Sequence, residues 1–395
     1  MSDPIAAALS RYVEAGELAG AAALVWRNGA ADVTTVGWRD REAGLPVERD
    51  TLFRIASMTK PVTSVAVMTL IEEGKIGLDT PVARIAPEFA DMRVLRDPNG
   101  PLDDTAPAER GITFHDLLTH RSGLTYGGFH QGPLAAAYAE ALGGDIDSHV
   151  APDDWIANLA ALPLIAQPGA GFNYGCSVDL LGLLIARIEG RPLPEVLARR
   201  VFRPLGMKDT GFWAPADRRA KLYGFDGSGK LAPRLTAAGD STLPERPADM
   251  AFCSGGQGLW STLDDYLAFA RLFVEQGAPL LAPETMAGVM ANHLTPEQGT
   301  SATMFGMPVF GTGHGFGLGL ATVIDPETAS YTRGKGGVGT VSWPGAFGGW
   351  WQADPTDGSV LIFLAHNVLE PEQIMMGVGL GVYAAIAEFH ALGRA

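Results

Sequence analysis

Cysteine is scarce in this sequence, and long hydrophobic runs are absent. Only Cys176 and Cys253 occur among the 395 residues, which excludes a disulfide framework for a chain of this size. One bridge between them stays open, although two thiols in a reducing compartment are the simpler interpretation. No stretch of 18 apolar residues could form a transmembrane helix, and the first twenty residues lack the basic and apolar segments of a signal peptide. We expect a cytoplasmic protein with no membrane partner.

Basic residues are also few, with 29 Lys and Arg against 44 Asp and Glu and a net charge of −15. Binding to a phosphate backbone needs clustered cations, and the densest basic stretch is only Arg199, Arg200 and Arg203. Nucleic acid is therefore excluded as a partner. The motifs H-E-x-x-H and C-x-x-C are missing, and so is the G-x-S-x-G of α/β-hydrolases. We expect no metal and no organic cofactor.

The remaining pattern indicates an antiparallel sheet built from both terminal parts of the chain. A helix is expected to open at Ser2 or Asp3, and Asn28-Gly29 is a strong hairpin signal between two strands. A second helix should begin near Ser57 and stop at Gly74. β-type stretches return in FGLGLATVI, TVSWPGAFGGWWQAD and SVLIFLAHN, before a final helix over roughly residues 371–392.

Between these parts, apolar residues recur at helical spacing. They do so in FHDLLTH, DDWIANLAAL, SVDLLGLLIARIEG, LPEVLARRVFRPLG and TLDDYLAFARLFVEQG. The order of elements predicts an α/β (α+β) fold, with an antiparallel sheet flanked by helices and a helical insertion. We place an α/β domain at residues 1–78 and 301–395 and a mostly helical domain at 79–300, with the active site in the cleft between them.

The segment F-R-I-A-S-M-T-K, residues 53–60, holds the first candidate for chemistry. Ser57 and Lys60 are three apart, so on a helix they share one face. A serine hydroxyl needs a base to become a nucleophile, and a lysine desolvated in a pocket can serve as that base. At a helix N-terminus, the Ser57 amide could also stabilise an oxyanion. An S-x-x-K tetrapeptide alone would more simply be a solvated lysine.

Four stretches together resemble the serine β-lactamase and penicillin-binding protein superfamily. They are F-R-I-A-S-M-T-K-P-V-T-S, I-T-F-H-D-L-L-T-H-R-S-G-L, F-N-Y-G-C-S-V-D-L-L-G and S-W-P-G-A-F-G-G-W-W-Q-A-D-P, in this order along most of the chain. The third motif of penicillin-recognising members is usually K-T-G. Here Trp343-Pro344-Gly345-Ala346 is closer to the class C-like carboxylesterases called family VIII, although Lys335-Gly336-Gly337 just upstream could be a K-T-G variant.

The resemblance implies a role for each matching residue. Ser57 would be the acylated nucleophile, with Lys60 and Tyr174 as the proton-relay pair, and either of the two could accept the proton. The amides of Ser57 and Ala346 would form the oxyanion hole. Trp343 and Gly345 would line the substrate pocket. Two further residues complete the expected substrate site: Tyr126, which follows the second stretch, and His314, in a glycine-rich loop.

Three departures from the superfamily pattern favour neutral esters over penicillins. Pro344 replaces the usual second residue of the third motif and removes one backbone donor, which would reshape the strand edge. Cys176 stands where β-lactamases have an asparagine, and a thiol is the weaker hydrogen-bond partner. The third motif has no lysine, so a cation that would recognise a substrate carboxylate is missing. We expect a serine carboxylesterase acting on small, short-chain esters. The alternatives are a β-lactamase, a D-alanyl-D-alanine carboxypeptidase or D-aminopeptidase-like enzyme, and a non-catalytic binding protein on the same fold. The oligomeric state does not follow from the sequence.

Overall fold

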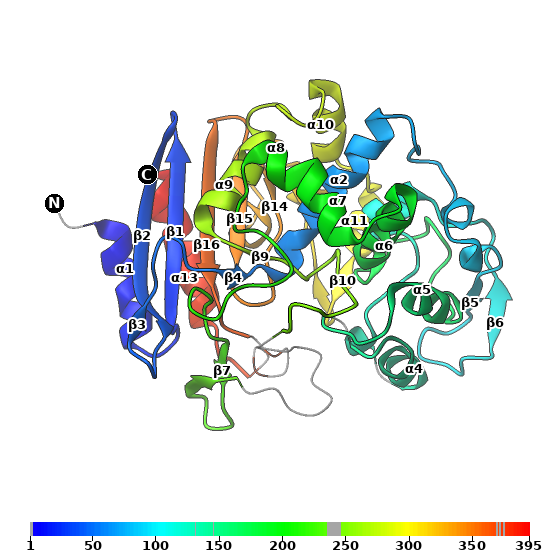
Figure 1. The fold of residues 1–395 in the computed structure, drawn as a ribbon, viewed down its shortest axis with the longest axis horizontal. Coiled ribbons are helices and arrows are strands. Elements are labelled where there is room, and N and C mark those ends of the chain that lie inside the picture. Colours follow the sequence, from blue (N-terminus) through cyan, green and yellow to red (C-terminus); the bar gives the residue numbers. More distant parts are fainter. Residues whose placement is uncertain are drawn as a thin grey trace.

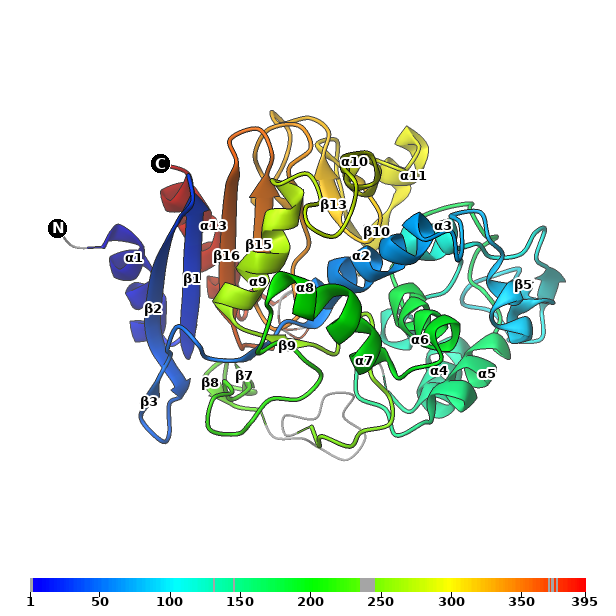
Figure 2. The same ribbon diagram turned by 45° about the horizontal axis from the view of Figure 1, so that its top comes forward.

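An eight-stranded antiparallel sheet is the framework of the protein. The computed structural model describes residues 3–130, 132–144, 146–234, 246–368, 370, 373 and 376–395. The strand order is β12-β13-β14-β15-β16-β1-β2-β3. The strands are β12 (His314–Phe316), β13 (Ala321–Val323), β14 (Val341–Ser342), β15 (Trp350–Asp354), β16 (Ser359–Ala365), β1 (Gly20–Arg27), β2 (Ala30–Asp40) and β3 (Leu45–Pro46). Figures 1 and 2 show this sheet running from β2 and β1 on the left to β15 and its neighbours near the centre of the molecule.

The expected joining of the two terminal parts of the chain is confirmed at the centre of the sheet. β1 pairs with β16, so that Ala21 faces Ala365 and Trp26 faces Val360. The hairpin between β1 and β2 turns at Asn28-Gly29, and both residues have positive φ, 54° and 82°. Two adjacent positive φ angles match the right-handed twist of the flanking strands, which is why this dipeptide suits the turn.

Both faces of the sheet are covered. On one face lie α1 (Pro4–Glu14), capped by Asp3 as expected, and α13 (Gly381–Arg394), which pack on Ala21, Ala23 and Phe363. The alternate residues Ala22 and Leu24 belong to the large core on the other face. The predicted final helix begins only at Gly381, because residues 376–380 form a turn in which Gly377 and Gly379 have positive φ angles of 81° and 78°. Residues 371, 372, 374 and 375 of the predicted range lie outside the described part.

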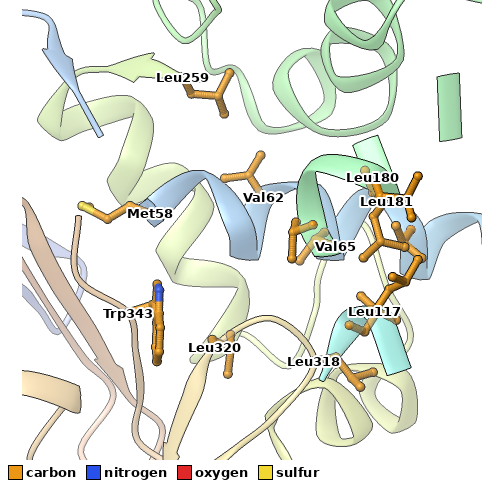
Figure 3. Close-up of a cluster of buried hydrophobic side chains, with 14 of the residues drawn as sticks. Met58, Val62, Val65, Leu117, Leu180, Leu181, Leu259, Leu318, Leu320 and Trp343 are labelled. Atoms are coloured by element: carbon orange, nitrogen blue, oxygen red, sulfur yellow. The ribbon is translucent and has the colours of Figure 1, made fainter. Parts of the chain in front are cut away.

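Two helices connect the other face of the sheet to the helical region. They are α2 (Thr59–Glu72) and α9 (Leu263–Ala270), and α9 packs on β16 and β1. α2 is buried on nearly its whole circumference, and Figure 3 shows Val62 and Val65 of this helix among leucines from several other segments. Gly74, with φ of 70°, follows its end as predicted. The division at residues 78 and 301 stays a prediction, and α9 lies on the sheet although it belongs to the segment expected to be helical insertion.

The other helices lie mostly on the right in Figure 1. Each of the five predicted helical segments is confirmed, because each forms one or more of these helices or α9. These helices are α3 (Phe114–Leu118), α4 (Pro133–Leu142), α5 (Pro152–Ala160), α6 (Ser177–Glu189), α7 (Leu193–Leu197), α8 (Arg203–Leu205), α10 (Pro283–Met290) and α11 (Pro296–Ser301). Small two-stranded pairs are β4 (Phe53–Arg54) with β9 (Trp260–Ser261), β5 (Arg93–Leu95) with β6 (Thr105–Pro107), β7 (Tyr223–Phe225) with β8 (Leu231–Pro233), and β10 (Thr303–Met304) with β11 (Met307–Pro308). Within the described ranges, no helix is both long and apolar enough to cross a bilayer, and Cys176 and Cys253 are not joined by a disulfide.

The β character expected for residues 340–354 is confirmed only at the two ends of this stretch. Val341–Ser342 and Trp350–Asp354 form the strands β14 and β15, and a turn joins them. Pro344 lacks an amide proton, the Gly345 amide donates back to the Gly349 carbonyl oxygen at 2.7 Å, and Gly348 has a φ of 80°. Proline and positive-φ glycine both interrupt a ladder, so the third motif lies in a turn.

A buried ion-pair network holds the segment that leads into α2. Asp147, between α4 and α5, lies with one carboxylate oxygen 2.8 Å from Arg54 Nη2 and with the other 2.7 Å from Arg246 Nη1. All three side chains are buried. Since Arg54 belongs to β4, just before Ser57, the network ties this strand to the helical region.

Replacing Asp147 with asparagine is expected to lower the free energy of unfolding by about 3–5 kcal/mol, because two buried guanidinium groups lose their shared carboxylate. Urea unfolding followed by circular dichroism measures this loss. Asp104→Asn is the matched control. Asp104 pairs with Arg96 at 3.3 Å with both side chains more than half exposed, so its loss should stay below about 1 kcal/mol. Equal losses in the two variants would contradict the role given to the buried network.

Candidate active site

Ser57 lies in a short 3-10 turn, Ala56–Met58, that runs directly into α2. Its side chain is nearly buried and lines the main cavity of the described structure. The preceding residue, Ala56, has a φ of 45°. A left-handed conformation costs an alanine on the order of 1–2 kcal/mol, and such strain concentrates at functional sites. The local geometry therefore singles out this serine.

Lys60 is fully buried, yet its ammonium has a partner for each of its three protons. Nζ lies 3.2 Å from Ser57 Oγ, 3.2 Å from Tyr126 Oη and 3.1 Å from the Gly256 carbonyl oxygen. The first contact follows from the spacing of three residues on one helix face. The other two come from distant segments. Together they remove the cost of leaving an ammonium without partners inside the protein.

A buried acid, Asp179, balances the charge of Lys60 through Tyr126. Tyr126 donates its hydroxyl proton to Asp179 Oδ2 at 2.8 Å, and Asp179 Oδ1 accepts from the Ser254 hydroxyl and from the Gly256 amide. Burial raises the pKa of Asp179, while the charge of Lys60 acts to lower it. Burial and the nearby Asp179 also raise the pKa of Tyr126 well above its ordinary value. Tyr126 thus stays a protonated bridge between cation and acid.

Tyr174 brings a second phenol to the serine. Its Oη lies 2.7 Å from Ser57 Oγ, closer than Lys60 Nζ. The indole N–H of Trp343 donates to the same Oη at 3.1 Å, and Lys60 Nζ lies 4.6 Å from the centre of the Tyr174 ring. An indole N–H can only donate, so both neighbours favour negative charge on this oxygen. Both proton acceptors that the sequence leaves open, Tyr174 Oη and Lys60 Nζ, thus lie within hydrogen-bond distance of Ser57 Oγ.

The turn between β14 and β15 brings Gly345 and Ala346 to the wall of the same cavity that Ser57 lines. A β-carbon at Gly345 would lie 2.4 Å from the Ile55 carbonyl oxygen, so only glycine allows the turn to approach the residues before the serine this closely. This approach places Ala346 and Ser57 on the same cavity, as an oxyanion hole made of their two amides requires.

The cavity itself has a volume of about 580 Å³ and mostly apolar walls. Phe305, on the turn of the β10–β11 hairpin, packs edge-to-face on Phe129 with ring centres 4.5 Å apart, and Phe129 stacks on Tyr174. Further apolar lining comes from Ile146, Leu222, Met304 and Met307. The sequence pattern did not reveal this wall, because its members come from separate loops. Such a surface suits an apolar acyl or alcohol group.

Two residues weighed in the sequence lie away from this cavity. His314, expected to contact substrate, is buried on β12, where its ring nitrogens lie 3.2 Å from the Phe310 carbonyl oxygen and 2.8 Å from that of Gly334. It does not line the cavity, so its position gives that expectation no support. Lys335, in the alternative third motif, is exposed and also outside the lining residues. Of the two candidate third motifs, the one at residues 343–346 lines the cavity that contains Ser57.

A broad antiparallel sheet flanked by helices, with a serine and a lysine one turn apart at the start of a buried helix, defines the serine β-lactamase-like class of proteins. The family model described as Beta-lactamase matches residues 5–375. The chain belongs to this family, as the resemblance of its motifs implied.

The comparisons also find named relatives. An uncharacterized protein of Mycobacterium tuberculosis is 44% identical over 369 residues, covering 91% of this chain and 89% of that protein. Esterase EstB of Burkholderia gladioli is 33% identical over 367 residues, covering 89% and 87%. Among solved structures, that of EstCE1, a hydrolase with promiscuous acyltransferase activity, superposes with a TM-score of 0.78 at 27% identity and covers 96% of this chain and 97% of its own.

Proposed function

We propose that this protein is a serine carboxylesterase that forms an acyl-enzyme on Ser57. The observation that carries the proposal is the contact of Ser57 Oγ with both Tyr174 Oη and Lys60 Nζ, at 2.7 Å and 3.2 Å, on the wall of an apolar cavity. The name of EstB and the description of EstCE1 as a hydrolase support the same reading.

In the proposed reaction, Tyr174 reacts as the phenolate: Ser57 Oγ attacks the ester carbonyl carbon while its proton passes to Tyr174 Oη, which becomes a neutral phenol. The amides of Ser57 and Ala346 hold the oxyanion of the tetrahedral intermediate. The intermediate expels the alcohol, which takes the proton back from Tyr174. A water molecule then attacks the acyl group in the same way, so that one ester and one water give one acid and one alcohol. Lys60 keeps its charge throughout and stabilises the negative charge that moves between the two oxygens.

The third motif favours esters over lactams as substrates. Where penicillin-recognising members have lysine, Trp343 donates its N–H to Tyr174. Cys176, in place of the usual asparagine, is buried at the start of α6 and is not among the cavity-lining residues. Neither residue offers the contacts that hold a lactam in those enzymes.

The test compares p-nitrophenyl butyrate with nitrocefin as substrates of the purified protein. We expect kcat/KM for the ester to exceed that for the lactam by roughly 100-fold, since two charged or amide contacts to the lactam are missing and each is worth about 1.5 kcal/mol. A faster reaction with nitrocefin would identify a β-lactamase. Turnover of neither substrate, together with no covalent adduct from a fluorophosphonate probe in an intact-mass spectrum, would favour a binding protein.

A further inference from the structure

A second cation borders the cavity beside the proposed catalytic group. Arg333 ends the short turn Tyr331–Arg333 and lines the cavity that contains Ser57. Its guanidinium carbon lies 4.8 Å from the centre of the Trp343 ring, whose N–H donates to Tyr174. One indole ring thus separates this positive charge from the phenol that contacts the serine.

Arg333 has no carboxylate partner among the described residues. Its one hydrogen bond there runs from Nη1 to the Thr332 carbonyl oxygen at 3.3 Å, and its buried Nε has no partner. Burial lowers the pKa of Arg333, and the groups acting in the opposite direction are two phenols, Tyr174 and Tyr383. Arg333 is half-buried and lines the cavity, with no anion of the described residues beside its guanidinium, so a negative group bound in the cavity would find a charged hydrogen-bond donor there.

The second arginine on the cavity wall differs in this respect. Arg234 lies 3.0 Å from Glu370 and is thereby neutralised. The same wall also includes Tyr331, Tyr383 and Ile386, which are two aromatic rings ending in hydroxyls and one aliphatic side chain. This combination of one uncompensated guanidinium and apolar walls is suited to an organic anion with a hydrocarbon skeleton.

We propose that Arg333 binds a carboxylate of the substrate, so that the esters this protein prefers are anionic. The inference rests on the proposed esterase function and specifies its substrate class. It also changes the expectation of neutral esters drawn from the missing third-motif lysine, because Arg333 supplies a cation from the preceding turn. The carboxylate could be carried by the acyl part or by the alcohol part of the ester, and the test separates the two.

Two substrate pairs differ in one charge each. In the acyl pair, p-nitrophenyl hydrogen glutarate is compared with its neutral methyl ester. In the alcohol pair, 4-carboxyphenyl butyrate is compared with 4-(methoxycarbonyl)phenyl butyrate. For each pair, the ratio of kcat/KM for the anionic ester to that for the neutral ester is measured in the wild type and in Arg333→Gln. We expect this ratio to fall roughly 10- to 100-fold in one pair, as for loss of a charged hydrogen bond, with the change carried by KM.

Two further variants make the result specific. Arg333→Lys keeps the charge and should recover part of the ratio, although a lysine cannot bind both carboxylate oxygens side by side. Arg234→Gln removes the neutralised arginine and should change the ratio less than Arg333→Gln does. A ratio that stays constant in Arg333→Gln for both pairs, or one that falls equally in Arg234→Gln, would overturn the inference.

The failure of this inference can be told from failure of the esterase proposal. If the neutral esters are hydrolysed in a reaction that requires Ser57 and the ratio is insensitive to Arg333, only the carboxylate site is wrong. If the wild type hydrolyses none of the four esters, the esterase proposal fails, and the carboxylate site fails with it as a part of that function.

Discussion

Replacing Ser57 with alanine is expected to lower kcat/KM for p-nitrophenyl butyrate by roughly 10⁵-fold or more, the size of loss seen when a serine hydrolase loses its nucleophile. The same variant should form no covalent adduct with a fluorophosphonate. Because Ser57 is a small side chain at the cavity wall, the thermal unfolding midpoint should change little. Stopped assays over several hours measure the residual rate, and intact-mass spectra measure the adduct.

Ser64→Ala is the matched control for that experiment. Ser64 lies two turns further along the same helix, is fully buried, and its hydroxyl has no hydrogen-bond partner among the described residues. Removing it deletes a buried serine without touching the cavity, so its rate should stay close to that of the wild type. A Ser57→Ala variant that still hydrolysed the ester like Ser64→Ala would refute the assignment of the nucleophile.

Replacing Lys60 with methionine is expected to lower kcat by roughly 10²- to 10³-fold, the range for loss of one group that stabilises developing negative charge. The side chain keeps its length, but Ser57 and Tyr126 lose the ammonium that lies 3.2 Å from each. Negative charge on Tyr174 Oη would then lack its nearest cation. Lys75→Met is the control, because Lys75 is partly exposed and pairs with Glu73 and Glu189 at the surface. An equal loss in both variants would contradict the role of Lys60.

The Lys60→Met variant should also show an altered dependence of stability on pH. Burial already raises the pKa of Asp179, and the charge of Lys60 acts against that rise. Without Lys60, the folded protein holds the Asp179 proton to higher pH than the unfolded chain does. Stability therefore falls as pH increases above the unfolded pKa of the carboxyl group. The variant is expected to lose more stability than the wild type between pH 5 and pH 8, which urea unfolding at the two pH values would reveal.

Some contacts of the candidate site can be predicted from the sequence, and others cannot. The difference is how far apart the two contacting residues lie along the chain. Ser57 and Lys60 could be paired because one helical turn brings them together whatever the rest of the fold does. The Asn28-Gly29 hairpin was predictable for the same reason. Tyr174 and Trp343 were found through their motifs, and the structure brings Tyr174 to Ser57 and Trp343 to Tyr174. These are contacts for which a local pattern or a family motif carries the information.

Neither a local pattern nor a family motif predicted the other groups that surround the buried charge of Lys60. Asp179 stands in the first turn of an apolar helix, and an acid in such a helix is a signal that could have been followed. The Gly256 carbonyl and the guanidinium of Arg333 carry no such signal, because backbone atoms have no sequence code and arginine is usually at the surface. Their positions depend on how distant loops pack. The turn at Trp343 was missed because the surrounding aromatic and β-branched residues outweighed Pro344 and its glycines in the strand prediction.

The pairing of β1 with β16 has a consequence for the nascent chain. β1 lies at residues 20–27, whereas β16 ends at residue 365, and a ribosome adds on the order of 5–20 residues per second. For roughly tens of seconds, the apolar edge of β1 is therefore open to other chains, which is a known hazard of unpaired strands. Trp343 and the turn at Ala346 also arrive late, so the cavity around Ser57 closes only near the end of synthesis. Chaperone binding to the early β1–β2 hairpin would protect this protein during that interval.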